Sequence, residues 1–211
     1  MEKGKARSKL AHFWYYYKWH TLGVIFAAVV LAVGITQCAS RPKPDVTVVL
    51  YMDEVVSDNR VKALEEALQE YAQDTNGNGR VEVQVTNLSY PSSGGTRQAA
   101  LNSASLLLAQ MTQSDSILYI CDEHGYDFFA GKELFEQHDE LPDKDQTAFN
   151  WKGSALQKEL DTKFPDELYF GLRRVSGTTV EKDDGAAQRE RDAQALLNRV
   201  MKGEKTAPQQ K

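Results

Sequence analysis

Three short segments of this chain carry side chains that can transfer protons or bind a ligand. Each segment lies next to an apolar run and contributes carboxyl, imidazole or hydroxyl groups. The residues are Asp53 and Glu54; Ser92 and Ser93; and Asp122, Glu123 and His124. Carboxylates and imidazoles act as general acids, general bases or metal ligands, and a glycine-containing turn before a helix presents backbone amides to anions. These residues define the candidate binding chemistry.

The third segment is the densest group of metal-binding side chains. Asp122 and His124 supply two of the ligands that zinc needs, and Glu123 with Asp127 supplies two carboxylates for acid–base chemistry. His138 is the only other histidine after residue 20, so the sequence lacks a second spaced ligand pair. We therefore expect a solvated, ligand-contacting loop, with a small metal-dependent hydrolase as the alternative.

A second metal hypothesis concerns residues 74–79. Asp74, Asn76 and Asn78 occupy positions one, three and five of a calcium loop, and position six is a glycine. Position twelve, normally a glutamate, is Val85, and Glu82 at position nine is the substitute ligand. The sequence thus allows a structural Ca²⁺ site or a plain Asn-Gly turn. No other cofactor is expected.

Composition and missing motifs restrict the function further. The sequence has no Gly-x-Ser-x-Gly, P-loop, His-Glu-x-x-His or Cys-x-x-Cys motif, so we expect no catalysis. Of the 25 Lys and Arg and 30 Asp and Glu residues, five basic residues and one acid lie within residues 1–20, which leaves a net charge of −9 for the rest. An acidic domain argues against nucleic acid as a partner.

Strand-like and helix-like patterns alternate after residue 44. Apolar or alternating runs predict strands over residues 46–52, 81–85, 117–121 and 168–172. Helical spacing predicts helices over residues 59–73, 96–111, 132–138 and 186–201. This order favours an α/β fold with a parallel sheet covered on both faces. Loops after the strands then meet at one edge, which is where the three candidate segments and residues 176–179 are expected to lie.

The N-terminus determines the expected location. Residues 21–40 are uncharged and apolar, long enough as a helix to span about 30 Å, and the preceding segment is basic and aromatic. The predicted organisation is a cytoplasmic leader (1–20), a single transmembrane helix in the lipid bilayer (21–40), a linker (41–44), an extracellular α/β domain (45–203) and a disordered tail (204–211). A cleaved signal peptide or a lipoprotein signal ending at Cys38 are the alternatives, and both export the same domain.

Several segments resemble the N-terminal lobe of bacterial ABC-type extracellular solute-binding proteins. They are Val46 to Tyr51, Leu64 to Leu68, Asp74 to Val83, Leu108 to Met111 and Ser116 to Ile120. The leader residues Tyr16 to His20 also look like those of small anchored proteins of Gram-positive bacteria. The resemblance covers residues 45–138 and implies a periplasmic-binding-protein-like, three-layer domain.

Family members have two lobes, and this chain has the length for one. The resemblance therefore implies a membrane-anchored, single-lobe binding or interaction domain. Its expected ligand contacts are Asp53, Glu54, Ser92, Ser93, Asp122 and His124. The partner is either a small-molecule ligand or a second membrane protein with which the lobe pairs.

Overall fold

The computed structural model describes residues 19–34, 44–89, 105–107, 109, 111, 116–160 and 163–206. The chain divides into two units, Met1–Pro42 and Lys43–Lys211. In the first unit, residues 19–34 form a helix. Within the described residues, no helix combines the length and the apolar character needed to cross a membrane. Residues 35–40 of the predicted transmembrane segment lie outside the described residues.

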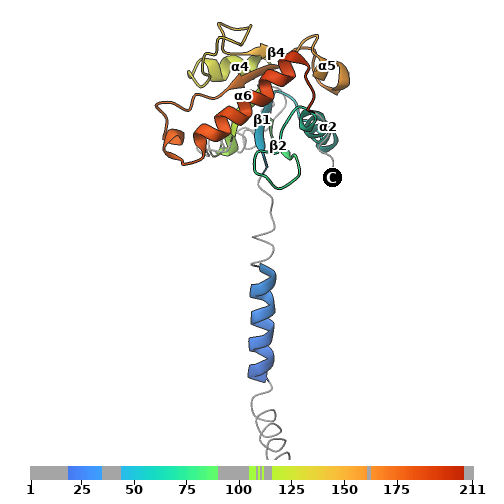
Figure 1. Cartoon of the computed structure of the whole chain (residues 1–211), viewed down its shortest axis with the longest axis vertical. Helices are drawn as coiled ribbons and strands as arrows, with labels where there is room; N and C mark the ends of the chain where they lie inside the picture. The colour runs from blue at the N-terminus through green and yellow to red at the C-terminus, as the bar shows by residue number, and fades with distance from the viewer. Residues whose placement is uncertain are drawn as a thin grey trace, which may run out of the picture. The chain divides into compact units, whose positions relative to one another are not determined.

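The second unit is an α/β domain (Figure 1). Its elements are β1 (Val46–Met52), α2 (Asp58–Gln69), β2 (Val83–Ser89), β3 (Ser116–Cys121), α4 (Glu123–Ala130), β4 (Phe149–Asn150), α5 (Ala155–Leu160), β5 (Tyr169–Leu172), the 3-10 helix η2 (Thr179–Lys182) and α6 (Ala186–Lys202). Residues 105–107, 109 and 111 are also helical. The α/β class expected from the sequence is confirmed.

The sheet has five strands in the order β2-β1-β3-β5-β4 and is mixed. β1 pairs in parallel with β2 and β3, but β5 is antiparallel to both β3 and β4. The prediction of a parallel sheet is therefore wrong for β5. Residues 122–168, which include α4, β4 and α5, connect β3 to β5, and the chain re-enters the sheet at the edge where β3 ends, because Tyr169 pairs with Cys121.

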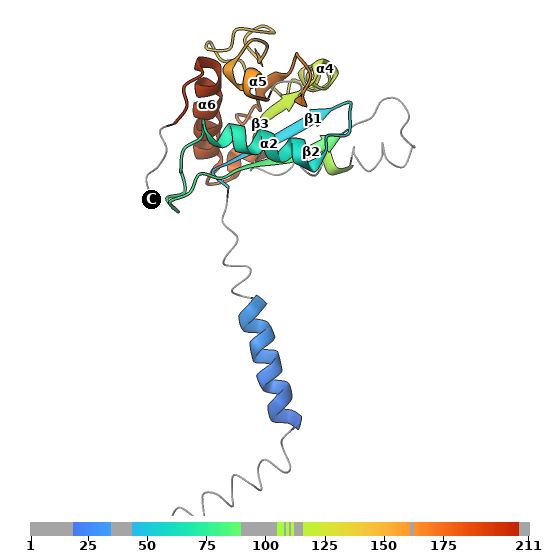
Figure 2. The same cartoon turned by 90° about the vertical axis from the view of Figure 1, so that its right-hand side faces the viewer.

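Buried apolar side chains lie on both faces of the sheet. On one face, alternate residues of β1 (Val48, Leu50 and Met52) pack with α2, α5 and α6. In Figure 2, α2 runs along the strands and α6 crosses them. On the other face, Val49 and Tyr51 pack with α4 and with Leu107. Because successive strand residues point to opposite faces, one seven-residue strand supplies both cores.

The structure has a helix, α4, where the sequence predicted a loop. The helix predicted over residues 132–138 is not formed. Asp122 caps α4, and Tyr126 and Phe129 lie one turn apart on its buried face. Residues 132–138 instead contain an isolated bridge in which Phe135 pairs with Arg173. Gly125 is a poor helix former, so the sequence of this segment did not indicate a helix.

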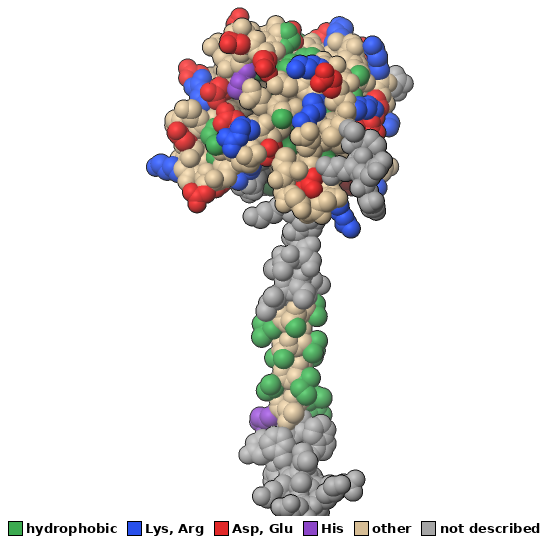
Figure 3. Space-filling view, viewed as in Figure 1, with side chains coloured by type: hydrophobic (Ala, Val, Ile, Leu, Met, Phe, Trp, Pro, Cys, Tyr) green, Lys and Arg blue, Asp and Glu red, His purple; other side chains and the backbone are tan. Residues whose placement is uncertain are grey.

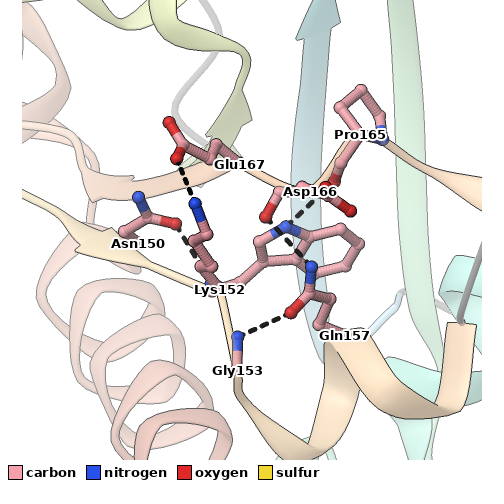
Figure 4. A network of polar contacts seen from close by, with 8 residues as sticks. Asn150, Lys152, Gly153, Gln157, Pro165, Asp166 and Glu167 are labelled. Carbon is pink, nitrogen blue, oxygen red and sulfur yellow. Dashed lines mark hydrogen bonds and ion pairs between the residues drawn. The ribbon is translucent and has the colours of Figure 1, made fainter.

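Polar bonds hold the segment between β4 and β5 (Figure 4). The indole Nε1 of the buried Trp151 donates to the carbonyl of Pro165 at 3.2 Å. Gln157 of α5 accepts from the Gly153 amide at 2.6 Å and donates to the carbonyl of Asp166 at 3.0 Å. These bonds hold α5 and Trp151 to the residues just before β5.

Two further contacts involve the edges of the domain. At the outer edge of β2, the Val85 amide donates to Oε1 of Glu65 of α2 at 2.8 Å. At the end of the described chain, Lys205 forms ion pairs with Glu70 and Glu159, and the Thr206 amide donates to the carbonyl of Glu70. Residues 204–206, the start of the predicted tail, are thereby attached to α2 and α5.

Candidate functional site

The candidate site lies at the carboxyl edge of the sheet, defined here as the edge at which β1 and β3 end. β1 lies between β2 and β3, so the chain turns to opposite sides of β1 after these two strands. α2, which follows β1, packs on one face of the sheet, and α4, which follows β3, packs on the other. The loops diverge here, and such a switch point is where open α/β sheets bind ligands.

Asp53 and Asp122 come directly after the paired residues of these two strands, and they lie in contact. Oδ2 of Asp122 accepts a hydrogen bond from the backbone amide of Asp53 at 2.6 Å. Oδ1 of Asp122 accepts from the amide of Gly125 at 2.8 Å, which caps the first turn of α4. The sequence therefore identified two residues that the fold brings together, and the Asp122 carboxylate links the ends of β1 and β3.

The other sequence-predicted residues of this edge differ in their surroundings. Glu123 and His124 are exposed on the first turn of α4, not on a loop. Glu54 forms an ion pair with Arg60 at 2.5 Å, and the Arg60 guanidinium lies 4.9 Å from the centroid of the Phe164 ring. Glu54 thus faces the start of α2.

Two ionisable side chains beneath this edge are held in their neutral forms. Burial is the largest cause that raises the pKa of Tyr51 to about 12, and Cys121, Asp122 and Asp53 are the smaller causes. Burial also raises the pKa of the Cys121 thiol, with Asp122 as a second cause. Neither side chain is therefore ionised near pH 7, which removes the thiolate and the phenolate as nucleophiles at this edge.

Because β5 is antiparallel to β3, the residues before β5, and not those after it, lie at this edge. Tyr169, the first residue of β5, pairs with Cys121, so β5 begins where β3 ends. Ser176 and Thr178 follow β5 and accordingly lie toward the opposite edge, in contrast to the prediction. In their place, the start of β5 and the loop before β4 contribute Tyr169 and Lys144.

Lys144 is the centre of a group of charged and aromatic side chains that the sequence analysis missed. Its ammonium lies 3.8 Å from Oε1 of Glu123 and 3.7 Å from Oδ1 of Asp127, both on α4. The same ammonium lies 5.6 Å from the ring centroid of Tyr126 and 5.0 Å from that of Tyr169. We call Glu123, Asp127, Tyr126 and Tyr169 the cation cage.

The loop that carries Lys144 has an uncommon backbone. Lys144, Asp145 and Gln146 have φ values of 50°, 58° and 64°, three successive left-handed residues without a glycine. This conformation costs roughly 1–2 kcal/mol for each such residue. The His138 amide donates to the carbonyl of Gln146 at 2.8 Å, and Oγ1 of Thr147 donates to the carbonyl of Lys144 at 2.5 Å. Surrounding bonds therefore impose the conformation.

The predicted calcium loop lies at the opposite, amino edge. Both carboxylate oxygens of Asp74 accept backbone amides, those of Gly77 at 2.7 Å and Gly79 at 2.8 Å. Oδ1 of Asn76 accepts the Asn78 amide at 3.0 Å, and Oδ1 of Asn78 accepts the Arg80 amide at 2.8 Å. The Glu82 amide donates to Oδ2 of Asp45 at 2.8 Å. The loop is thus ordered by its own side chains, and calcium binding stays a prediction.

A pocket of about 520 Å³ also lies at the amino edge, between β1, β2 and α6. Its polar lining includes Thr47, Gln84, Thr86, Gln188 and Asp192. A hydrogen bond of 2.8 Å joins Gln188 to Asp192 within α6.

Figure 3 shows that acidic and basic side chains are interspersed on one face of the domain.

The remaining predicted contacts, Ser92 and Ser93, lie outside the described residues. Among the residues that the structure describes, no three or more His, Cys, Asp and Glu side chains are grouped so that they could hold a metal ion. Comparisons of the chain with protein family models, with curated proteins and with solved structures find no match.

Proposed function

We propose that this chain is a membrane-tethered, non-catalytic binding protein whose α/β domain binds its ligand at the carboxyl edge of β1 and β3. The observation that carries the proposal is the contact between Asp53 and Asp122 at the switch point of the sheet. The neutral forms of Tyr51 and Cys121 favour binding over nucleophilic chemistry at this edge.

The arrangement of β1, α2, β2 and β3 also supports the resemblance to one lobe of a solute-binding protein. In that resemblance the domain is a single lobe that contacts a solute, or a second protein, with the edge where a two-lobed protein closes. The uncharged segment of residues 21–40 supports the membrane tether, with the N-terminus in the cytoplasm and the domain outside the cell.

Thermal unfolding of the purified full-length chain tests the binding function. A ligand present at about one hundred times its Kd adds roughly 2.7 kcal/mol to the free energy of unfolding. A panel of sugars, amino acids, peptides and organic cations should contain a compound that raises Tm by several degrees. His124→Ala, at the carboxyl edge, should reduce the shift, whereas Gln84→Ala, at the amino-edge pocket, should leave it unchanged. A shift lost only in Gln84→Ala would refute the proposed site.

The tether is tested separately in cells. A tagged full-length chain should stay in the membrane pellet after alkaline carbonate washing, and protease added to intact cells should degrade the domain. Release of the chain by carbonate, or protection of the domain from external protease, would contradict the proposed location.

A further inference from the structure

The cation cage has the composition of a binding site for a positively charged ligand. Two carboxylates and two aromatic rings surround one ammonium, at 3.7 Å and 3.8 Å from the oxygens and at 5.0 Å and 5.6 Å from the ring centroids. Carboxylates attract a cation by charge, and aromatic faces attract it through their quadrupoles. The four groups come from α4 and β5, two separate parts of the chain that the fold brings together.

Two observations distinguish the ammonium of Lys144 from an ordinary surface charge. The Tyr126 and Tyr169 side chains are buried, at 2% and 6% exposure, so the rings form a fixed floor. Lys144 is also the first of three successive residues with positive φ, a conformation that the surrounding bonds impose. The fold thus places a cation over this floor in a defined position.

The contacts of Lys144 nevertheless leave it replaceable. Its distances to Glu123 and Asp127 exceed the range of a direct hydrogen bond, so the ammonium is held mainly by the local field. The carboxylates stay 59% and 65% exposed and retain acceptor capacity toward solvent. One lysine also leaves this group of two carboxylates with a net negative charge.

We propose that the cation cage binds the ammonium group of an organic cation and that Lys144 is a tethered occupant which the ligand displaces. This inference rests on the proposed function, because Glu123 follows Asp122 directly and the cage continues the same edge. It assigns the ligand a class, organic amines and quaternary ammonium compounds. With an internal occupant, the apparent affinity equals the intrinsic affinity multiplied by the fraction of time that the cage is empty.

Removal of the occupant is the sharpest test. Lys144→Asn removes the cation and suits the left-handed backbone, since asparagine tolerates positive φ. The matched control is Lys132→Asn, because the Lys132 ammonium also lies over a ring, 4.9 Å from the centroid of Phe128. Full-length protein is titrated with tetramethylammonium and with spermidine at constant ionic strength, by calorimetry and by NMR of ring-labelled tyrosine.

We expect the Tyr126 and Tyr169 ring signals to shift in every titration that shows heat. Lys144→Asn should bind about tenfold more tightly than the wild type, the factor for a cage that Lys144 fills about nine-tenths of the time. Lys132→Asn should bind like the wild type, and Glu123→Gln with Asp127→Asn should lose the binding.

Four results would overturn the inference. Lys144→Asn could bind the cations no more tightly than the control, or the tyrosine rings could stay unshifted. Alternatively, inorganic phosphate could bind the wild type and lose its binding in Lys144→Asn, which would make Lys144 an anion ligand. A sugar or peptide that raises Tm while both cations fail would refute the cage and leave the proposed function intact.

Discussion

The ring of Phe135 lies so close to Gly171 that no side chain fits between them. A Cβ atom built on Gly171 would lie 2.7 Å from both Cδ1 and Cε1 of Phe135. The ring has little freedom to move, because it stacks on Tyr126 at 5.1 Å and contacts Phe129 at 5.9 Å between centroids. The middle of β5 therefore requires glycine for reasons of packing.

Gly171→Ala should destabilise the domain by about 1–3 kcal/mol, the usual range for overpacking a core. Urea unfolding of the full-length chain measures the change. Phe135→Leu combined with Gly171→Ala should lose less stability than the sum of the two single variants, since the smaller side chain makes room for the methyl group. Strict additivity would show that the two residues do not compete for space.

Asp122→Ala should lower stability by about 1–3 kcal/mol, because the amides of Asp53 and Gly125 both lose their acceptor. Asp122→Asn keeps one carbonyl oxygen and should lose less. His124→Ala, at an exposed position in the first turn of the same helix, serves as the control and should change stability by no more than about 0.5 kcal/mol. Equal effects of all three variants on the urea midpoint would contradict the capping role.

Asp45→Ala should destabilise the amino edge by about 2 kcal/mol. Its buried carboxylate accepts the amides of Thr75 at 2.8 Å, Asn76 at 3.1 Å and Glu82 at 2.8 Å, so one side chain connects β1 to the turn before β2. Amide hydrogen exchange should accelerate at these three positions before any global unfolding. Unchanged exchange rates there would show that water replaces the carboxylate without loss.

Glu190→Gln should raise stability at neutral pH but not in acid. Burial raises the pKa of Glu190, and Glu136 raises it further, whereas His138 and Arg191 lower it. The folded state therefore favours the protonated carboxyl, a contribution that is present below the unfolded pKa of about 4.3 and is lost as pH rises through the folded pKa. Glutamine mimics the protonated form, so the gain in Tm over the wild type should appear only above that pH. A constant gain at all pH values would exclude titration of Glu190 as its cause.

Calcium should raise Tm if the Asp74 loop is a metal site. At 10 mM Ca²⁺, a site with a Kd of about 0.1–1 mM adds roughly 1–3 kcal/mol. Asp74→Asn and addition of a chelator should each remove that gain. Identical unfolding curves with Ca²⁺ and with chelator would leave the loop as a turn ordered by its own amide bonds.

The sequence predicted the elements whose pattern is local. β1 matches its predicted range because its run of β-branched and apolar residues has clear ends, and α6 begins at Ala186 as its apolar spacing indicated. β2 covers Val83–Ser89 and not residues 81–85, because it pairs with β1 along its whole length, up to Ser89 opposite Met52. The neighbouring positions of Asp53 and Asp122 followed from the order of the strands alone.

Features that depend on contacts between distant residues could not be predicted in this way. The apolar residues of β5 give the same pattern in either strand direction, and its antiparallel direction appears only in its pairing with β3 and β4. Lys144 meets Asp127 and Tyr169 across the fold, and no spacing in the sequence indicates these contacts. The cation cage is therefore visible only in the structure.

The bond between Glu65 and the Val85 amide removes one hydrogen-bond donor from the outer edge of the sheet. A sheet that ends in a row of free amides and carbonyls is a template on which another molecule can add a strand, and repeated addition leads to fibrils. Here an acidic side chain from α2 occupies one of those amides and places like charges between approaching edges. One amide of the outer edge of β2 is thus already bonded within the molecule and does not serve an added strand.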